Sequence, residues 1–141
     1  MNLGWFQDGW WLAVAILTPL GLAALLGVKS LRGAVAGCAP LAAVPALGVV
    51  FLGPSEMVLK LPWLLQGSML VLDETGRVFL GFTSALYLAA AWYARAYLAT
   101  DDAAPRFFVL LFAAMTGNFA LILAGDVAAF YCGVALMGLA A

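Results

Sequence analysis

The sequence contains no histidine, and only 9% of its 141 residues are charged. Six lysines and arginines stand against seven acidic residues, so there is no basic field that would attract nucleic acid. A histidine-dependent nucleophile–base pair is excluded by composition, and the glycines form no phosphate-binding loop. We therefore expect no catalytic residue, no bound cofactor and no nucleic-acid partner.

Cysteine is also scarce. Cys38 and Cys132 both lie inside apolar runs, without metal-ligand spacing and without a histidine to complete a metal site. Free cysteine usually behaves as a small buried side chain. We predict that both cysteines are buried and that the chain holds no metal.

Apolar residues are abundant, at 67% of the chain with a mean hydropathy of +1.10, which is typical of an integral membrane protein. A cleaved signal peptide carries positive charge ahead of its apolar run. Here no lysine or arginine precedes Lys29, although an apolar run begins at Trp10. We predict a mature first helix, with Trp5, Trp10 and Trp11 at the membrane boundary.

The pattern of apolar runs predicts an all-α transmembrane domain over residues 1–141. Four full spans are expected, followed by a short fifth helix, at about residues 9–28, 34–52, 78–98, 107–125 and 127–141. Pro19 should kink the first span, and Gly33 and Gly37 form a small-xxx-small pair that permits close helix packing or dimerisation. Residues 53–76 contain turn-like and alternating features, which predict an extramembrane hairpin.

The last apolar run follows Asp126 and is only about 22 Å long at the rise of an α-helix. A hydrocarbon core measures about 30 Å, so we expect a partner to complete or cover this helix. Loop charges predict the orientation. Lys29, Arg32, Arg95 and Arg106 fall on one side, against two basic residues on the other, so the N-terminus and hairpin should lie outside and the C-terminus in the cytoplasm. A bacterial inner membrane is the expected location.

Polar residues inside the predicted spans are the candidates for function. Asn118, Thr116 and Tyr87, together with Thr83 and Ser84, could line a hydrated path or bond to neighbouring helices. Arg95 lies near the end of the third span, where its side chain could extend to the interface or contribute to ion passage.

The order of motifs resembles the N-terminal part of antiporter-like membrane subunits of respiratory complex I, membrane-bound hydrogenases and multisubunit cation/proton antiporters. The resemblance covers roughly the final 80 residues, and spans one and two match in placement only. The matching residues are Leu72-Asp73, Tyr93, Tyr97, Arg106-Phe107-Phe108 and Met137-Gly138-Leu139. Glu74 stands where the family usually has glycine.

One departure bears on function. The family has a Trp-Glu pair before the Met-Gly-Leu ending, and its buried glutamate is coupled to a lysine two helices on. Val134 and Ala135 occupy those positions here, so the resemblance implies that this chain has lost the proton-exchanging group.

Two interpretations follow from the resemblance. The chain is a degenerate or split antiporter-like subunit beside a larger multi-span partner, or a scaffold that seals the flank of an ion- or carbon-translocating assembly. An inorganic-carbon uptake complex is a setting for either. An alternative is an independent small homo-oligomeric transporter or channel.

Overall fold

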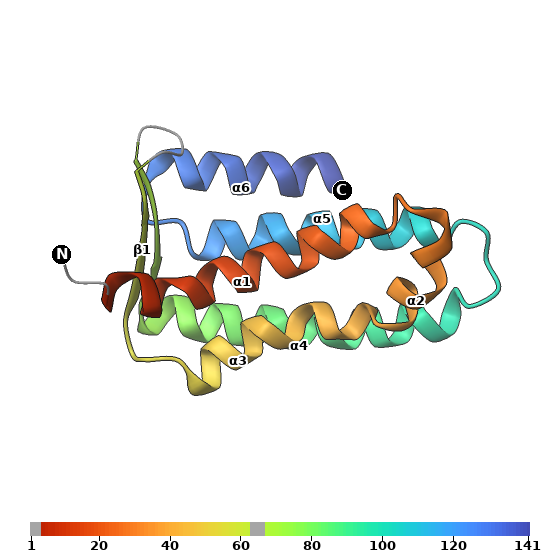
Figure 1. The fold of residues 1–141 in the computed structure, drawn as a ribbon, viewed down its shortest axis with the longest axis horizontal. Coiled ribbons are helices and arrows are strands. Elements are labelled where there is room, and N and C mark those ends of the chain that lie inside the picture. Colours follow the sequence, from red (N-terminus) through yellow and green to blue (C-terminus); the bar gives the residue numbers. More distant parts are fainter. Residues whose placement is uncertain (1–3, 63–66) are drawn as a thin grey trace.

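The computed structural model describes residues 4–62 and 67–141, with the backbone alone for residues 4–8. The protein is mostly helical, and its elements in chain order are α1 (Gly4–Leu25), η1 (Lys29–Leu31), α2 (Arg32–Gly37), η2 (Ala39–Ala43), α3 (Val44–Leu52), β1 (Met57–Leu61), β2 (Ser68–Leu72), α4 (Glu74–Tyr97), α5 (Ala104–Ile122) and α6 (Val127–Ala140). The long helices run along one common axis, and the two strands stand across one end of the bundle (Figure 1). The turn from α1 through α2 and the loop from α4 to α5 lie at the opposite end.

Helix α5 is the centre of the packing, because α1, α2, α4 and α6 all contact it. Phe108, Phe112, Met115 and Phe119 are buried and recur at helical spacing, so they form one continuous face of α5. At about 25 cal/mol per Å² of buried apolar surface, such aromatic side chains dominate the stabilisation of a bundle in water. Within a bilayer, close packing takes over that role.

Helices α5 and α6 approach each other through two glycines. A methyl group on Gly117 would lie 2.6 Å from the backbone nitrogen of Met137, and one on Gly133 would lie 2.7 Å from that of Leu121. Each glycine also meets the carbonyl oxygen of the other. Only residues without a side chain permit backbones to come this close, which is the packing mode favoured between helices in membranes.

The predicted hairpin is confirmed. Strands β1 and β2 are antiparallel, with Met57 paired to Leu72 and Leu61 to Ser68, while residues 63–66 at the turn lie outside the described part. Gly67 has φ +103°, a conformation that favours glycine. Alternate side chains of both strands are buried against the helices.

Strand β2 is also bonded on its second edge, to the connection between α5 and α6. The Val71 N–H donates to the Leu123 carbonyl at 2.7 Å, and the Gly125 N–H donates to the Met69 carbonyl at 2.9 Å. Both edges of this strand therefore have partners, and the hairpin is fixed to the end of the helical bundle.

The prediction of one continuous second span over residues 34–52 is wrong. Residues 34–52 fall into α2, the 3₁₀ segment η2 and α3, with Pro40 near the start of η2 and Pro45 in the first turn of α3. Proline lacks an N–H and disfavours helical geometry in the residue before it, so each proline starts a new segment. By contrast, α1 continues as one helix through Pro19.

Two smaller predictions, about glycines of α2 and about the cysteines, are also corrected. Gly33 and Gly37 have nothing within 4 Å of an added methyl group, so they make no close helix contact within the chain. Cys38 and Cys132 are exposed on the bundle surface rather than buried. In a mostly apolar chain, composition alone does not separate the inward face of a helix from the outward one.

By length and composition, one helix of the described residues, Ala104–Ile122, could cross a membrane alone. A second candidate reaches membrane-spanning length only as a pair of helices bent by 111°, Gly9–Leu25 and Lys29–Gly37. Ala39–Leu52 and Val127–Ala140 are shorter apolar stretches. In α4, Arg77 and Arg95 lie near the two ends of the helix. The helices α4, α5 and α6 otherwise begin and end within a few residues of the predicted boundaries.

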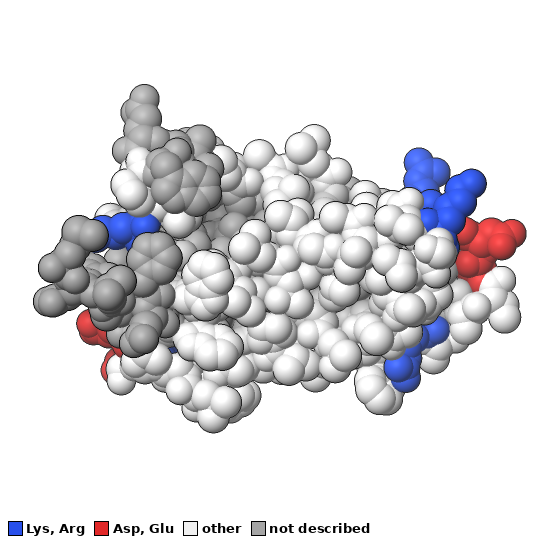
Figure 2. Space-filling model, in the orientation of Figure 1, with Lys and Arg blue, Asp and Glu red and all other residues white. Residues whose placement is uncertain are grey.

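Charged residues gather at the two ends of the molecule, and the surface between them is uncharged over the face shown (Figure 2). The end with the α1–α2 turn and the α4–α5 loop carries four basic and two acidic residues. The hairpin end carries two basic and five acidic residues. The chain is therefore polarised, with a basic end and an acidic hairpin end.

Candidate functional site

The structure brings two of the predicted polar residues together. The Asn118 amide on α5 donates to the hydroxyl oxygen of Tyr87 on α4, at the long distance of 3.4 Å. The Tyr87 ring also meets Phe119 edge-to-face, with ring centroids 6.1 Å apart. Both polar side chains are half-buried, so this pair is a contact between helices with partial access from outside the bundle.

The buried hydroxyl groups on α4 and α5 are satisfied within their own helices, whereas the buried Ser68 hydroxyl on β2 has no hydrogen-bond partner among the described residues. Thr116 is 2% exposed and donates to the Phe112 carbonyl at 2.8 Å, and Ser84 is fully buried and donates to the Leu80 carbonyl at 2.6 Å. Bonds to the carbonyl one turn earlier consume the hydroxyl proton without linking one helix to another. Thr116 is therefore separate from the Asn118–Tyr87 pair and offers no connected polar path.

Arg95 lies at the basic end, exposed in the last turn of α4. Its guanidinium donates to the Gly37 carbonyl at 3.0 Å and stands 4.7 Å from the centre of the Trp92 ring. A cation in the last turn of a helix is favoured by the helix dipole, and its contact with Trp92 is a cation–π interaction. The residue thus joins α4 to the C-terminal end of α2 and lies outside the interior of the bundle.

None of the Asp, Glu, Lys or Arg side chains within residues 9–62 and 67–141 is buried. Ala135, for which the resemblance implies a lost glutamate, is exposed on α6, as is its neighbour Val134. A longer side chain at residue 135 would therefore point away from the α5–α6 contact.

The structure assigns Asp126 a role that the sequence indicates only in part. Its carboxylate accepts from the Ala129 N–H at 2.8 Å and so caps α6. It also accepts from the Met69 N–H at 2.6 Å, across 57 positions of sequence. These bonds, first that from Ala129 and then that from Met69, lower the pKa of Asp126 below its ordinary value. An aspartate before an apolar run is a signal for the cap, whereas nothing local predicts the bond to β2.

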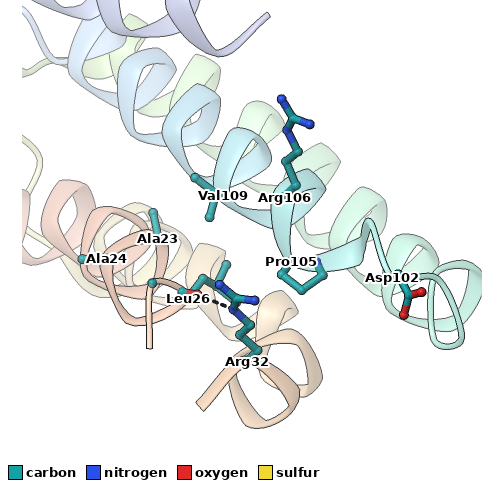
Figure 3. Close-up of a pocket in the computed structure, with 9 residues that line it drawn as sticks. Ala23, Ala24, Leu26, Arg32, Asp102, Pro105, Arg106 and Val109 are labelled. Atoms are coloured by element: carbon teal, nitrogen blue, oxygen red, sulfur yellow. Dashed lines mark hydrogen bonds between the residues drawn. The ribbon is translucent and has the colours of Figure 1, made fainter. Parts of the chain in front are cut away.

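A groove of about 570 Å³ opens at the basic end, between the end of α1, the start of α2 and the first turn of α5. Its lining combines alanine and valine side chains with Arg32, Asp102 and Arg106 (Figure 3). Arg32 reaches back along the groove, where its Nε donates to the Leu26 carbonyl at 3.0 Å. From the sequence these arginines predict only the orientation, because no local pattern shows that α2 and α5 bring them to one groove.

No protein-family model matches this chain, and a search of curated proteins finds no match. The described residues also contain no group of three or more Cys, Asp or Glu side chains that could hold a metal ion.

Proposed function

We propose that this chain is a non-catalytic membrane subunit that resembles the N-terminal segment of a proton-translocating antiporter-like subunit. It spans the membrane with four helical segments and a shorter fifth, and it packs beside a larger multi-span subunit that carries the ionisable groups. The host is a complex I-like, antiporter or inorganic-carbon uptake assembly in a bacterial inner membrane.

The observation that supports this proposal most directly is the chemistry of the interior. Proton or ion transfer across a bilayer needs a chain of ionisable or hydrated groups. Among the described residues the buried hydroxyls of Ser84 and Thr116 are bonded to their own backbones, and the charged side chains lie outside the core. A subunit built this way depends on a neighbour for the transfer step.

The uncharged surface between two charged ends supports placement in a bilayer (Figure 2). The excess of lysine and arginine at the α1–α2 and α4–α5 turns supports a cytoplasmic location for that end. The test uses Ser30→Cys and Thr75→Cys, at exposed positions of opposite ends, in a chain whose two native cysteines are replaced by alanine. A membrane-impermeant maleimide should label Thr75→Cys in intact cells, and Ser30→Cys only after lysis. The reverse pattern would overturn the orientation.

Purification in mild detergent tests the partner. A long co-purifying subunit with lysine and glutamate inside its membrane spans is the expected result. Association with a soluble metalloenzyme alone would instead support the carbon-uptake setting. A homogeneous monomer with no companion subunit would contradict the proposal.

The half-buried Asn118–Tyr87 pair favours one second candidate, an independent homo-oligomeric transporter or channel. That candidate requires the purified chain alone to conduct ions in liposomes, with loss of conduction in Asn118→Leu. We expect no conduction. Thr18→Val is the matched control, since Thr18 is half-buried on α1 and donates only to the Val14 carbonyl.

A further inference from the structure

The groove at the basic end carries positive charge that the described part of the chain does not neutralise. Arg32 uses its Nε on the Leu26 carbonyl, and Arg106 is exposed without any hydrogen bond or ion pair to the described residues. Asp102 also lines the groove, but its carboxylate lies on the other side of Pro105 from Arg32 and points away from both guanidinium groups (Figure 3). No ion pair joins it to either arginine in this part of the structure.

The first turn of α5 adds to this positive potential. It contains no acidic residue, and its cap residue Ala103 offers no side-chain hydrogen bond. The N-terminus of a helix has a partial positive charge, which disfavours an arginine there. The Asp101 carboxylate accepts from the Ala103 N–H at 2.8 Å and offsets part of this charge, but no ion pair joins it to Arg106. The groove therefore favours a negatively charged occupant.

The apolar side chains that line the rest of the groove indicate which kind of anion would bind. Ala23 on α1 lies toward Val109 on α5, and Ala24 lines the groove further from Val109, so these side chains form its apolar wall (Figure 3). A small inorganic anion gains nothing from an apolar wall, whereas an amphipathic molecule can bury its hydrocarbon there. The groove has a volume of about 570 Å³ and is largely open, so it would hold only part of such a molecule.

We infer that this groove binds an anionic phospholipid, with the phosphate between Arg32 and Arg106 and the upper part of one acyl chain against Ala23, Ala24 and Val109. The inference depends on the proposed membrane placement, because the lipid would be drawn from the leaflet that surrounds the basic end. Arg32 is held by its bond to the Leu26 carbonyl. The unbonded side chain of Arg106 extends away from Arg32 in Figure 3, and it must turn back across the rim to reach the headgroup.

Native mass spectrometry of the purified full-length chain tests the site. The probes are phosphatidylglycerol, phosphatidylcholine and inorganic phosphate. We expect phosphatidylglycerol to bind most tightly, phosphatidylcholine to bind weakly and phosphate alone not to displace the lipid. Each arginine near an anionic headgroup contributes about 1 kcal/mol, so Arg106→Gln should weaken phosphatidylglycerol binding roughly fivefold.

Lys29→Gln is the matched control, because Lys29 is exposed at the same end and does not line the groove. It removes the same charge and should change binding little. If Lys29→Gln and Arg106→Gln weaken phosphatidylglycerol binding equally, the lipid is held only by general electrostatic attraction. That result would contradict a specific site in the groove. Equal binding of phosphatidylcholine, or full displacement by inorganic phosphate, would also overturn it.

Arg32→Gln also removes the hydrogen bond to the Leu26 carbonyl, so a loss of lipid binding in this variant would not separate binding from folding. Arg106→Gln is therefore the variant that tests the site. Ala23→Phe fills the groove without changing charge, and it should weaken lipid binding while helicity is retained. The proposed subunit function is tested independently in the same variants, by membrane insertion and by co-purification of the partner. Loss of lipid binding with insertion and partner retained would separate the two proposals.

Discussion

The α5–α6 pair and the α2–α3 segment are both apolar and both contain a pair of glycines, yet the glycines meet different surroundings. Gly117 and Gly133 lie where two backbones touch, whereas Gly33 and Gly37 face open space. The difference arises from proline. Pro40 and Pro45 divide the α2–α3 segment into short pieces, whereas α5 continues without a break and offers a long surface to α6.

Gly133→Ala should have the largest effect on stability. The added methyl group would lie 2.7 Å from the Leu121 nitrogen and 3.0 Å from the Gly117 carbonyl oxygen, and neither backbone atom can move freely. Overpacking of this kind costs about 1–3 kcal/mol, so the free energy of unfolding should fall by that amount. Unfolding in mixed micelles, followed by circular dichroism, measures it.

Gly33→Ala is the matched control and should change stability in the opposite direction. The site has room for a methyl group, and alanine is favoured over glycine in a helix by about 0.5–1 kcal/mol. If Gly33→Ala and Gly133→Ala lowered the free energy of unfolding equally, the proposed difference in packing between the two regions would be contradicted.

Asp126→Ala should have the next largest effect, because it removes both the cap of α6 and the anchor of β2. Amide hydrogens of Met69 and Val71 should exchange faster than in the wild type. Asp73→Ala is the comparison, since Asp73 caps α4 through the Gly76 N–H without a bond to a distant strand. Similar exchange rates at Met69 in the two variants would contradict the anchoring role.

The same carboxylate should make stability depend on pH. The pKa of Asp126 is lowered in the folded chain, so its contribution is fully present above the unfolded value near 3.8. It is lost as the pH falls through the lower folded value. Titration of thermal stability from pH 5 downward should show this loss in the wild type, with a smaller slope in Asp126→Asn.

Pro45→Ala should have a smaller effect. Pro45 occupies the first turn of α3, where a missing N–H costs little, and its rigid ring limits the unfolded chain. Replacing it should lower the free energy of unfolding by about 0.4–1 kcal/mol. A large gain in helical content on substitution would instead show that proline alone prevents a continuous second span.

Ala135→Glu should leave the packing inside the bundle unchanged, because the residue is exposed on α6. In a bilayer the new carboxyl group would be protonated unless a basic group faces it. We expect no proton transport by the chain alone. Proton coupling gained in the assembled complex would indicate that a partner's basic group lies opposite this face.

Local signals in the sequence were sufficient to predict the hairpin and the break between α4 and α5, because neighbouring residues determine both. The hairpin followed from alternation and turn residues around Gly67, and the boundaries of α4 and α5 followed from the loop of aspartates and proline between them. The cysteines were placed wrongly, because an apolar run of this length has no polar face to mark its outer side.

Composition and the order of apolar runs by themselves determined a helical chain with its charges near the ends of the apolar runs and a hairpin before α4, since these properties depend on neighbours in sequence. The tertiary structure alone decided which glycines would touch, which strand edge Asp126 would anchor, and which arginines would share a groove. The bond between Asp126 and Met69, for example, joins residues 57 positions apart, so it depends on how the elements pack and on no local pattern.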